Sequence, residues 1–97
     1  MMKNLSMIFS LLFLLAFQAQ AQQRVSGTIL DENEEPLPGV SVLVQGTSTG
    51  TISDIDGNYS ITAANDAVLL FSFVGFTNQE IPVNGRSTID VNMEPNL

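Results

Sequence analysis

Asp54, Asp56 and Asn58 are the residues whose types and spacing most resemble a metal site. They lie in the run D-I-D-G-N, and closely spaced carboxylate and amide oxygens are ligands that Ca²⁺ prefers. An EF-hand loop needs glycine at its sixth position and a bidentate Glu at its twelfth. Counting from Asp54, Tyr59 is sixth and Asn65 is twelfth. The run is therefore not an EF-hand, and a loose surface calcium site remains the alternative.

The same run is also typical of a tight turn, and we favour this interpretation. Glycine after Asp supplies a left-handed backbone, and Asp side chains accept hydrogen bonds from nearby backbone N–H groups. Tyr59 and Ile61 then enter the core directly after the turn. We predict no bound metal or cofactor, and we assign structural turn roles to Gly39, Asp54, Asp56, Gly57, Asn84 and Gly85.

The remaining polar residues do not form a catalytic set. The sequence contains no His and no Cys, which excludes a Ser-His-Asp triad and a zinc site with His or thiolate ligands. The segment 31–35 carries four carboxylates, and we expect neighbouring carboxylates in a loop to repel one another and face water. A carboxylate pair of the glycosidase type needs a cleft, which so small a chain without helices scarcely builds. We therefore predict that the protein is not an enzyme.

Short runs with period-two alternation make up most of the chain, and Gly, Pro, Asn and Asp separate them. Strands are expected at residues 24–30, 40–45, 50–53, 58–63, 68–74, 76–83 and 87–93. Short strands at intervals of about ten residues are typical of a sandwich. The predicted fold class is all-β, a seven-stranded antiparallel β-sandwich.

The alternation also predicts which side chains form the core. The fifth run, V-L-L-F-S-F-V, is apolar on both faces, so we expect a central strand covered on both sides, with Phe71 and Phe73 buried. Tyr59 and Phe76 could instead form a platform for sugar rings, but core packing is the favoured role. The other inward residues are expected to be Val25, Ile29, Val40, Val42, Val44, Ile61, Ile89, Val91 and Met93.

Turn residues predict how the strands connect. Asn84-Gly85 stands between two alternating runs and is a strong signal for a two-residue hairpin, since both residues need positive φ. Residues 64–67 form a second turn, and Gly75 marks a tight bend. Pro82 has no N–H, which predicts that its strand lies at a sheet edge or at a break in pairing.

The first 21 residues have the features of a secretory signal peptide. A basic residue, Lys3, precedes an apolar run of about 13 residues and the small-x-small pattern Ala19-Gln20-Ala21. A membrane-spanning helix needs roughly 20 apolar residues, so we expect cleavage after Ala21. The mature domain would then be residues 22–97, and 97 minus 21 leaves 76 residues. We expect no membrane span in this mature chain.

The charge balance limits the partners. Without Lys3, two arginines stand against ten carboxylates, which gives a net charge of 2 minus 10, or −8. Such a chain repels nucleic acids, because their binding depends on Lys and Arg that neutralise the phosphates. We therefore expect no nucleic-acid partner.

An ordered series of motifs resembles one known family. The series contains P-L-P-G-V at residues 36–40, G-T-x-x-G at residues 46–50 and D-x-D-G-x-Y at residues 54–59. It resembles the carboxypeptidase regulatory-like domain, a transthyretin-like sandwich, and more closely the copy found at the N-terminus of SusC/RagA-type TonB-linked outer-membrane transporters. Glu34 departs from the family pattern D-x-N-G-x-P, in which glycine is common, so this turn must carry strain or adopt another geometry.

The resemblance implies a non-catalytic periplasmic domain, associated with the outer membrane, that contacts a transporter or a component of the TonB system. The plug and barrel of those transporters have no counterpart in these 97 residues, so we expect an accessory module that works with a partner. The loop Asp31–Glu35 and the sheet edges are the expected contact surfaces. Two alternatives stay open: a small glycan-binding or adhesion module, and a truncated remnant without a function of its own.

Overall fold

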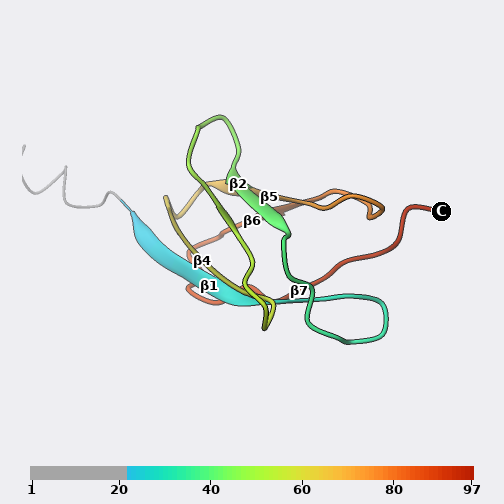
Figure 1. The fold of residues 1–97 in the computed structure, drawn as a ribbon. Helices are drawn as coiled ribbons and strands as arrows, with labels where there is room; N and C mark the ends of the chain where they lie inside the picture. Colours follow the sequence, from blue (N-terminus) through green and yellow to red (C-terminus); the bar gives the residue numbers. More distant parts are fainter. Residues whose placement is uncertain (1–21) are drawn as a thin grey trace, which may run out of the picture.

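A computed structural model describes residues 22–97, and these residues form seven strands in two layers (Figure 1). The predicted signal peptide, residues 1–21, lies outside the described residues. Within the described part of the chain, no helix is long and apolar enough to cross a bilayer. The prediction of an all-β sandwich with seven strands is confirmed.

The two layers are sheets of three and four strands. The three-stranded sheet has the order β4 (Asn58–Ala63), β1 (Gln23–Leu30), β7 (Val91–Asn92). The four-stranded sheet has the order β3 (Gly50–Ile52), β2 (Ser41–Val44), β5 (Val68–Ser72), β6 (Gln79–Pro82). Consecutive strands often lie in different sheets, so the chain crosses repeatedly between the layers.

The core lies between the sheets and follows from the alternation of the sequence. Side chains at every second position of β1, β2, β4 and β5 point into the same interior. Phe71 is the largest of the fully buried side chains, and its ring meets that of Tyr59 edge to face, with 5.4 Å between the centroids. All the other predicted inward residues are buried as well: Val25, Ile29, Val40, Val42, Val44, Ile61, Ile89, Val91 and Met93.

The prediction that all strands pair antiparallel is wrong at one place. β7 runs parallel to β1, with Ile29 opposite Val91 and Leu30 opposite Asn92. Strand β6 lies in the other sheet, so the chain passes to the second sheet through the exposed residues 84–88. It then runs beside β1 in the same direction. Parallel pairs require such a crossover rather than a hairpin.

The predicted hairpin at Asn84-Gly85 is therefore also wrong, although both residues have positive φ, 50° and 72°. The turn redirects the chain from β6 to the sheet that contains β7 instead of joining two neighbouring strands. The edge position predicted for Pro82 is confirmed, because β6 is the outer strand of its sheet.

The expectation for the fifth run also needs correction. Strand β5 is central, and Leu69 and Phe71 on its inner face are fully buried, but Leu70 on the outer face is only half-buried. Phe73 is half-buried against the core, and Val74 is 92% exposed. Within residues 22–97 no third layer covers this outer face, so the apolar run is covered fully on one side only.

Glu34 has the left-handed backbone that the motif comparison pointed to, with φ of 61°. Such a conformation costs a non-glycine residue about 1–2 kcal/mol, which the greater unfolded-state freedom of glycine offsets by about 0.4–1 kcal/mol. We expect Glu34→Gly to raise the free energy of unfolding by about 0.5–1 kcal/mol, measured by urea denaturation. Glu32→Gly is the control, because Glu32 does not have positive φ, and it should lower stability.

Candidate functional site

The run D-I-D-G-N forms a closed turn held by Asp54. The Asp54 carboxylate oxygen Oδ1 accepts hydrogen bonds from the backbone N–H groups of Asp56 (3.0 Å) and Asn58 (2.9 Å). Its backbone N–H donates to the Asn58 carbonyl at 2.9 Å, and its carbonyl accepts from Gly57 at 2.9 Å. Gly57 has φ of 76°, so it supplies the left-handed step that closes this turn.

The acidic segment at Asp31 repeats the same geometry. Asp31 Oδ1 accepts from the backbone N–H groups of Asn33 (2.8 Å) and Glu35 (3.0 Å), and Asp31 N–H donates to the Glu35 carbonyl at 2.9 Å. Glu34 stands where Gly57 stands in the other turn, and both have positive φ. The two acidic runs thus form the same turn. In each, the carboxylate of the first Asp accepts hydrogen bonds from the backbone N–H groups two and four positions later.

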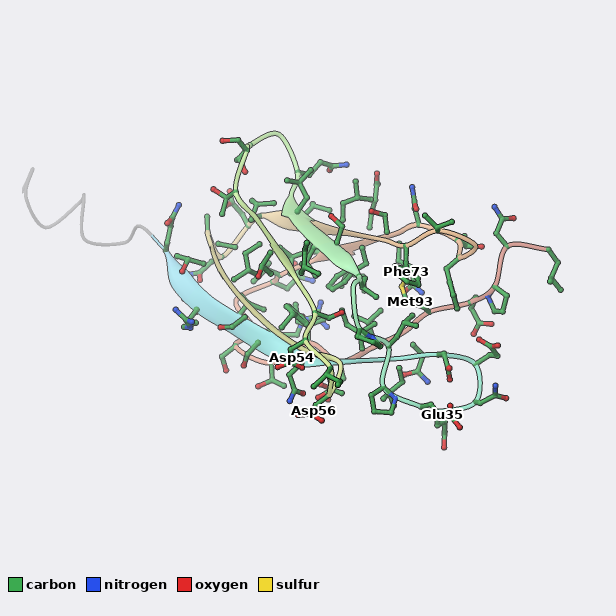
Figure 2. All side chains as sticks on the ribbon, viewed as in Figure 1. Glu35, Asp54, Asp56, Phe73 and Met93 are labelled. Atoms are coloured by element: carbon green, nitrogen blue, oxygen red, sulfur yellow. The ribbon has the colours of Figure 1, made fainter. Side chains whose placement is uncertain are left out.

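The Asp54 turn packs against the chain on either side of the Asp31 turn, at one end of the sandwich. The Ile29 N–H donates to the Gly57 carbonyl at 2.7 Å, and the Ile29 carbonyl accepts from Leu37 at 2.9 Å. A Cβ added to Gly57 would lie only 2.5 Å from the Ile29 oxygen, so glycine is required by space as well as by φ. Figure 2 shows Asp54 and Asp56 at the bottom of the view and Glu35 in the loop to the right of them.

The oxygens considered as calcium ligands already have partners in two cases. Asp54 Oδ1 accepts two backbone hydrogen bonds, and Asn58 Oδ1 accepts one from the Thr28 hydroxyl at 2.8 Å. Within residues 22–97, no three acidic side chains converge as a metal-binding group. This arrangement favours the structural role for Asp54 over a role as ligand.

We predict that Asp54→Ala lowers the free energy of unfolding by about 1–2 kcal/mol, because it removes the acceptor of two backbone hydrogen bonds. Asp54→Asn retains an oxygen and should lose less. Asp56→Ala is the matched control, since the Asp56 side chain makes no hydrogen bond within the described residues. Urea denaturation with and without calcium checks both interpretations, and stabilisation by calcium that depends on Asp54 would contradict the structural role.

The aromatic residues considered as a sugar platform are not displayed on the surface. Tyr59 is only 4% exposed, and its hydroxyl donates to the Ile89 carbonyl at 2.7 Å. Phe76 is half-buried and packs against Phe73, with 5.8 Å between the ring centroids. Tyr59 therefore packs in the core, as the favoured interpretation had it, and the geometry does not support the glycan-binding alternative.

The environment of Tyr59 makes stability depend on pH. Burial raises the pKa of the Tyr59 phenol from 10.0 to about 12, the Asp90 carboxylate adds to this shift, and Arg86 opposes it. Because the folded pKa is the higher one, the contribution of Tyr59 to stability is fully present below pH 10. It is lost as pH rises through about 12.

We therefore expect the free energy of unfolding to fall between pH 10 and about 12 in the natural protein. Tyr59→Phe should be less stable at neutral pH, by about 1–2 kcal/mol, since the buried Ile89 carbonyl loses its donor. Its stability should then change far less above pH 10, because residues 22–97 contain no lysine and no other tyrosine. Ultraviolet titration of the phenol checks the raised pKa directly, and a midpoint near 10 would contradict it.

The outer face of the four-stranded sheet carries a shallow groove of about 440 Å³. Ser41 and Ser72 lie opposite each other on β2 and β5 and form its floor, with Phe73 and Val74 beside them. The residues that line the groove carry no charge. It is a surface feature next to the exposed Val74.

Comparison with known proteins assigns the chain to a family. A family model described as the CarboxypepD_reg-like domain matches residues 25–96. The chain belongs to this family. The resemblance that the ordered motifs indicated is thus confirmed over nearly all of the described residues, whereas the boundary at residue 22 stays a prediction.

The curated relatives of this CarboxypepD_reg-like domain are TonB-dependent receptors. The chain is 42% identical over 78 residues to TonB-dependent receptor P39 of Formosa agariphila, which covers 79% of this chain. It is 40% identical over 90 residues, or 92% of this chain, to TonB-dependent receptor SusC of Bacteroides thetaiotaomicron. The matched parts are 8% and 9% of those receptors, so the chain spans less than a tenth of their length.

Solved structures share the fold at lower identity. A chain in a type II cohesin–X–dockerin complex from Acetivibrio cellulolyticus superimposes with a TM-score of 0.63 at 19% identity. The alignment covers 75% of this chain and 58% of that chain. This similarity shows the sandwich architecture alone, and the transthyretin-like subtype stays a prediction.

Two residues of the CarboxypepD_reg-like domain have structural roles that sequence analysis missed. The buried Ser53 hydroxyl accepts from the Val40 N–H at 2.9 Å and donates to the Leu37 carbonyl at 2.8 Å, which fixes the chain before β2. Gly27 on β1 lies directly against the backbone of Ile89. The Ser53 position falls in step with the alternation of β3, but neither residue type signals a long-range contact.

Proposed function

We propose that this CarboxypepD_reg-like domain is a non-catalytic interaction module of TonB-dependent uptake. It would work in the periplasm at the outer membrane and contact a transporter or a component of the TonB system. The observation that carries the proposal is the 40–43% identity to four TonB-dependent receptors over most of the chain. The fold alone would not suffice, because one fold serves many functions.

The arrangement of the polar residues supports a role in binding rather than catalysis. The two acidic turns use their first carboxylates, Asp31 and Asp54, to accept hydrogen bonds from the backbone, and the sequence offers neither a His to act as base nor a Cys to act as nucleophile. What the domain offers to other molecules is its exterior: the acidic end formed by Asp31–Glu35 and Asp54–Asp56, the groove beside Val74, and the sheet edges. A surface of this kind can bind another protein without catalysing a reaction.

Affinity capture from the organism that encodes the protein tests the proposal. The tagged full chain is expressed in those cells, crosslinked in vivo, and recovered from the envelope fraction. We expect a TonB-dependent receptor or a TonB-system protein to be enriched over a tagged, unrelated periplasmic protein. Recovery of neither class, or localisation of the chain in the cytoplasm, would contradict the proposal.

A charge-reversal variant sharpens the experiment. Glu32 and Glu35 are exposed and lie at the acidic end, and Glu35 contributes only its backbone to the turn. Glu32→Lys/Glu35→Lys should reduce capture if this end contacts the partner. Glu80→Lys, on the other sheet, is the matched control with one charge reversed away from that end. Equal capture by both variants would place the contact elsewhere on the surface.

A further inference from the structure

Strand β4 is an outer strand with hydrogen-bonding groups directed away from the sheet. It pairs with β1 on one side only. The hydrogen bond from Ile29 N–H to the Gly57 carbonyl fixes which residues face β1, because bonding alternates along an antiparallel pair. Tyr59, Ile61 and Ala63 bond to β1, so the N–H and C=O groups of Asn58, Ser60 and Thr62 point to the open side.

Only Ser60 and Thr62 keep these groups free. The Asn58 carbonyl accepts from Asp54 N–H at 2.9 Å, and its N–H donates to Asp54 Oδ1 at 2.9 Å. Within residues 22–97, no hydrogen bond reaches the outward backbone groups of Ser60 and Thr62. The Asp54 turn thus closes one end of the edge and leaves two residues available for pairing.

The edge of β6 is protected by contrast. Pro82 has no N–H, and its carbonyl accepts from the Arg86 guanidinium. Glu80, the next outward residue of β6, adds a charge that is hydrogen-bonded to Gln45. Proline and charge are the devices by which proteins prevent unwanted strand pairing.

The remaining edges are covered or short. The Asn92 carbonyl of β7 accepts from Gln79 Nε2 at 2.7 Å, and the Glu94 carbonyl accepts from Thr77 N–H at 2.8 Å. Strand β3 has only three residues. Strand β4 reads N-Y-S-I-T-A, with six residues, no proline and no charge, so it lacks these protections. The short strand β3 of the other sheet lies close to β4 but makes no ladder with it.

We propose that β4 pairs antiparallel with β4 of a second copy of this chain. In the register that uses both free residues, Ser60 lies opposite Thr62 of the second copy, and Thr62 lies opposite its Ser60. Each of these pairs makes two backbone hydrogen bonds, so the two-fold interface contains four. Ser60 opposite Ser60 would make only two, because the Asp54 turn occupies Asn58.

The side chains fit this register. Tyr59, Ile61 and Ala63 all point to the interior, so Ile61 would meet Ile61 of the second copy, and Tyr59 would meet its Ala63, in one continuous apolar layer. The outward side chains at the interface are the neutral Ser60 and Thr62. Like charges directly opposite each other destabilise a cross-strand pair, and no such pair forms between the two β4 strands.

The distribution of charge selects the antiparallel orientation and a second copy as the occupant. The end of the sandwich near Gly57 carries the six carboxylates of residues 31–35 and 54–56. The opposite end carries Arg24, Arg86 and Asp66. Arg24 pairs with Thr62 across the two strands, and the Arg86 carbonyl accepts a hydrogen bond from Gln23 Nε2. Antiparallel pairing brings the acidic end of one copy to the arginine end of the other, whereas parallel pairing would place the two acidic ends together.

The oligomeric state in solution tests this inference. The protein purified from cells that express the full chain is studied by sedimentation equilibrium and by light scattering, from micromolar to near-millimolar concentration. We expect a monomer–dimer equilibrium, and we expect the Ser60 and Thr62 amides to exchange more slowly with solvent as the concentration rises. A monomer throughout this range would overturn the inference and would leave the proposed function intact.

Charge variants test the register. Ser60→Lys/Thr62→Lys places lysines opposite each other twice, so self-association should weaken roughly tenfold or more. Ser60→Glu/Thr62→Glu should behave likewise, and an equimolar mixture of the two variants should recover the dimer. Thr88→Lys is the control, because Thr88 is exposed at the far side of the same sheet. Undiminished dimerisation of both double variants, or no recovery in the mixture, would overturn this interface.

Discussion

Phe71→Ala should remove a large part of the free energy of unfolding. Removing a buried phenylalanine side chain costs about 3–5 kcal/mol, whereas a domain of this size has a total stability of about 4–11 kcal/mol. Phe71 is fully buried and meets the Tyr59 ring edge to face. The fluorescence of Tyr59, the single tyrosine of the chain, reports directly on this contact during urea denaturation.

Phe73→Ala is the matched control for this experiment. The two residues are of the same type and lie two positions apart, but Phe73 is only half-buried at the edge of the core. Its removal should cost clearly less, about 1–2 kcal/mol, in proportion to the smaller apolar area removed from water. Equal losses in the two variants would contradict the placement of Phe71 inside the core and of Phe73 at its edge.

Gly27→Ala should be comparably damaging although it adds only a methyl group. A Cβ at this position would overlap the Ile89 carbonyl oxygen and lie 2.7 Å from its carbonyl carbon. Both are backbone atoms, so the segment before β7 would have to move away from β1. We expect a loss of about 3 kcal/mol, from overpacking together with weakened hydrogen bonds between these segments.

A second measurement separates this mechanism from general instability. The Ile89 carbonyl that would be displaced also accepts the Tyr59 hydroxyl hydrogen bond, so ultraviolet titration of any folded Gly27→Ala protein should show a changed phenol pKa. Gly46→Ala is the control, because nothing lies within 4 Å of an added Cβ there and only its φ of 81° is strained. A stable Gly27→Ala protein with an unchanged titration would contradict the close approach of β1 and Ile89.

The faces of the strands could be predicted from the sequence, whereas their partners could not. Period-two alternation identified the inward residues of β1, β2 and β4. One side of each strand is buried, so apolar and polar side chains alternate along the sequence of the strand itself. Alternation says nothing about which strand lies beside which. The parallel pairing of β7 with β1 depends on the path of the chain after Asn84-Gly85, and packing decides that path.

The turns illustrate the same division. Aspartate and glycine in D-I-D-G-N indicated a left-handed turn correctly from local chemistry. The identity of that turn with the one at Asp31 was hidden, because Glu34 stands where a glycine would have made the repeat visible. The roles of Ser53 and Gly27 depend on atoms of Leu37, Val40 and Ile89, which no local pattern in the sequence specifies.

The central position of β1 has a consequence for synthesis. This strand comes first in the described chain, yet one of its neighbours, β7, is almost the last segment. A ribosome or export channel that delivers the chain from its N-terminus releases β1 well before β7 is available. The three-stranded sheet is therefore complete only after residues near Val91 emerge, and contacts between such distant segments form slowly. Until then the backbone N–H and C=O groups on the β7 side of β1 have no partner strand.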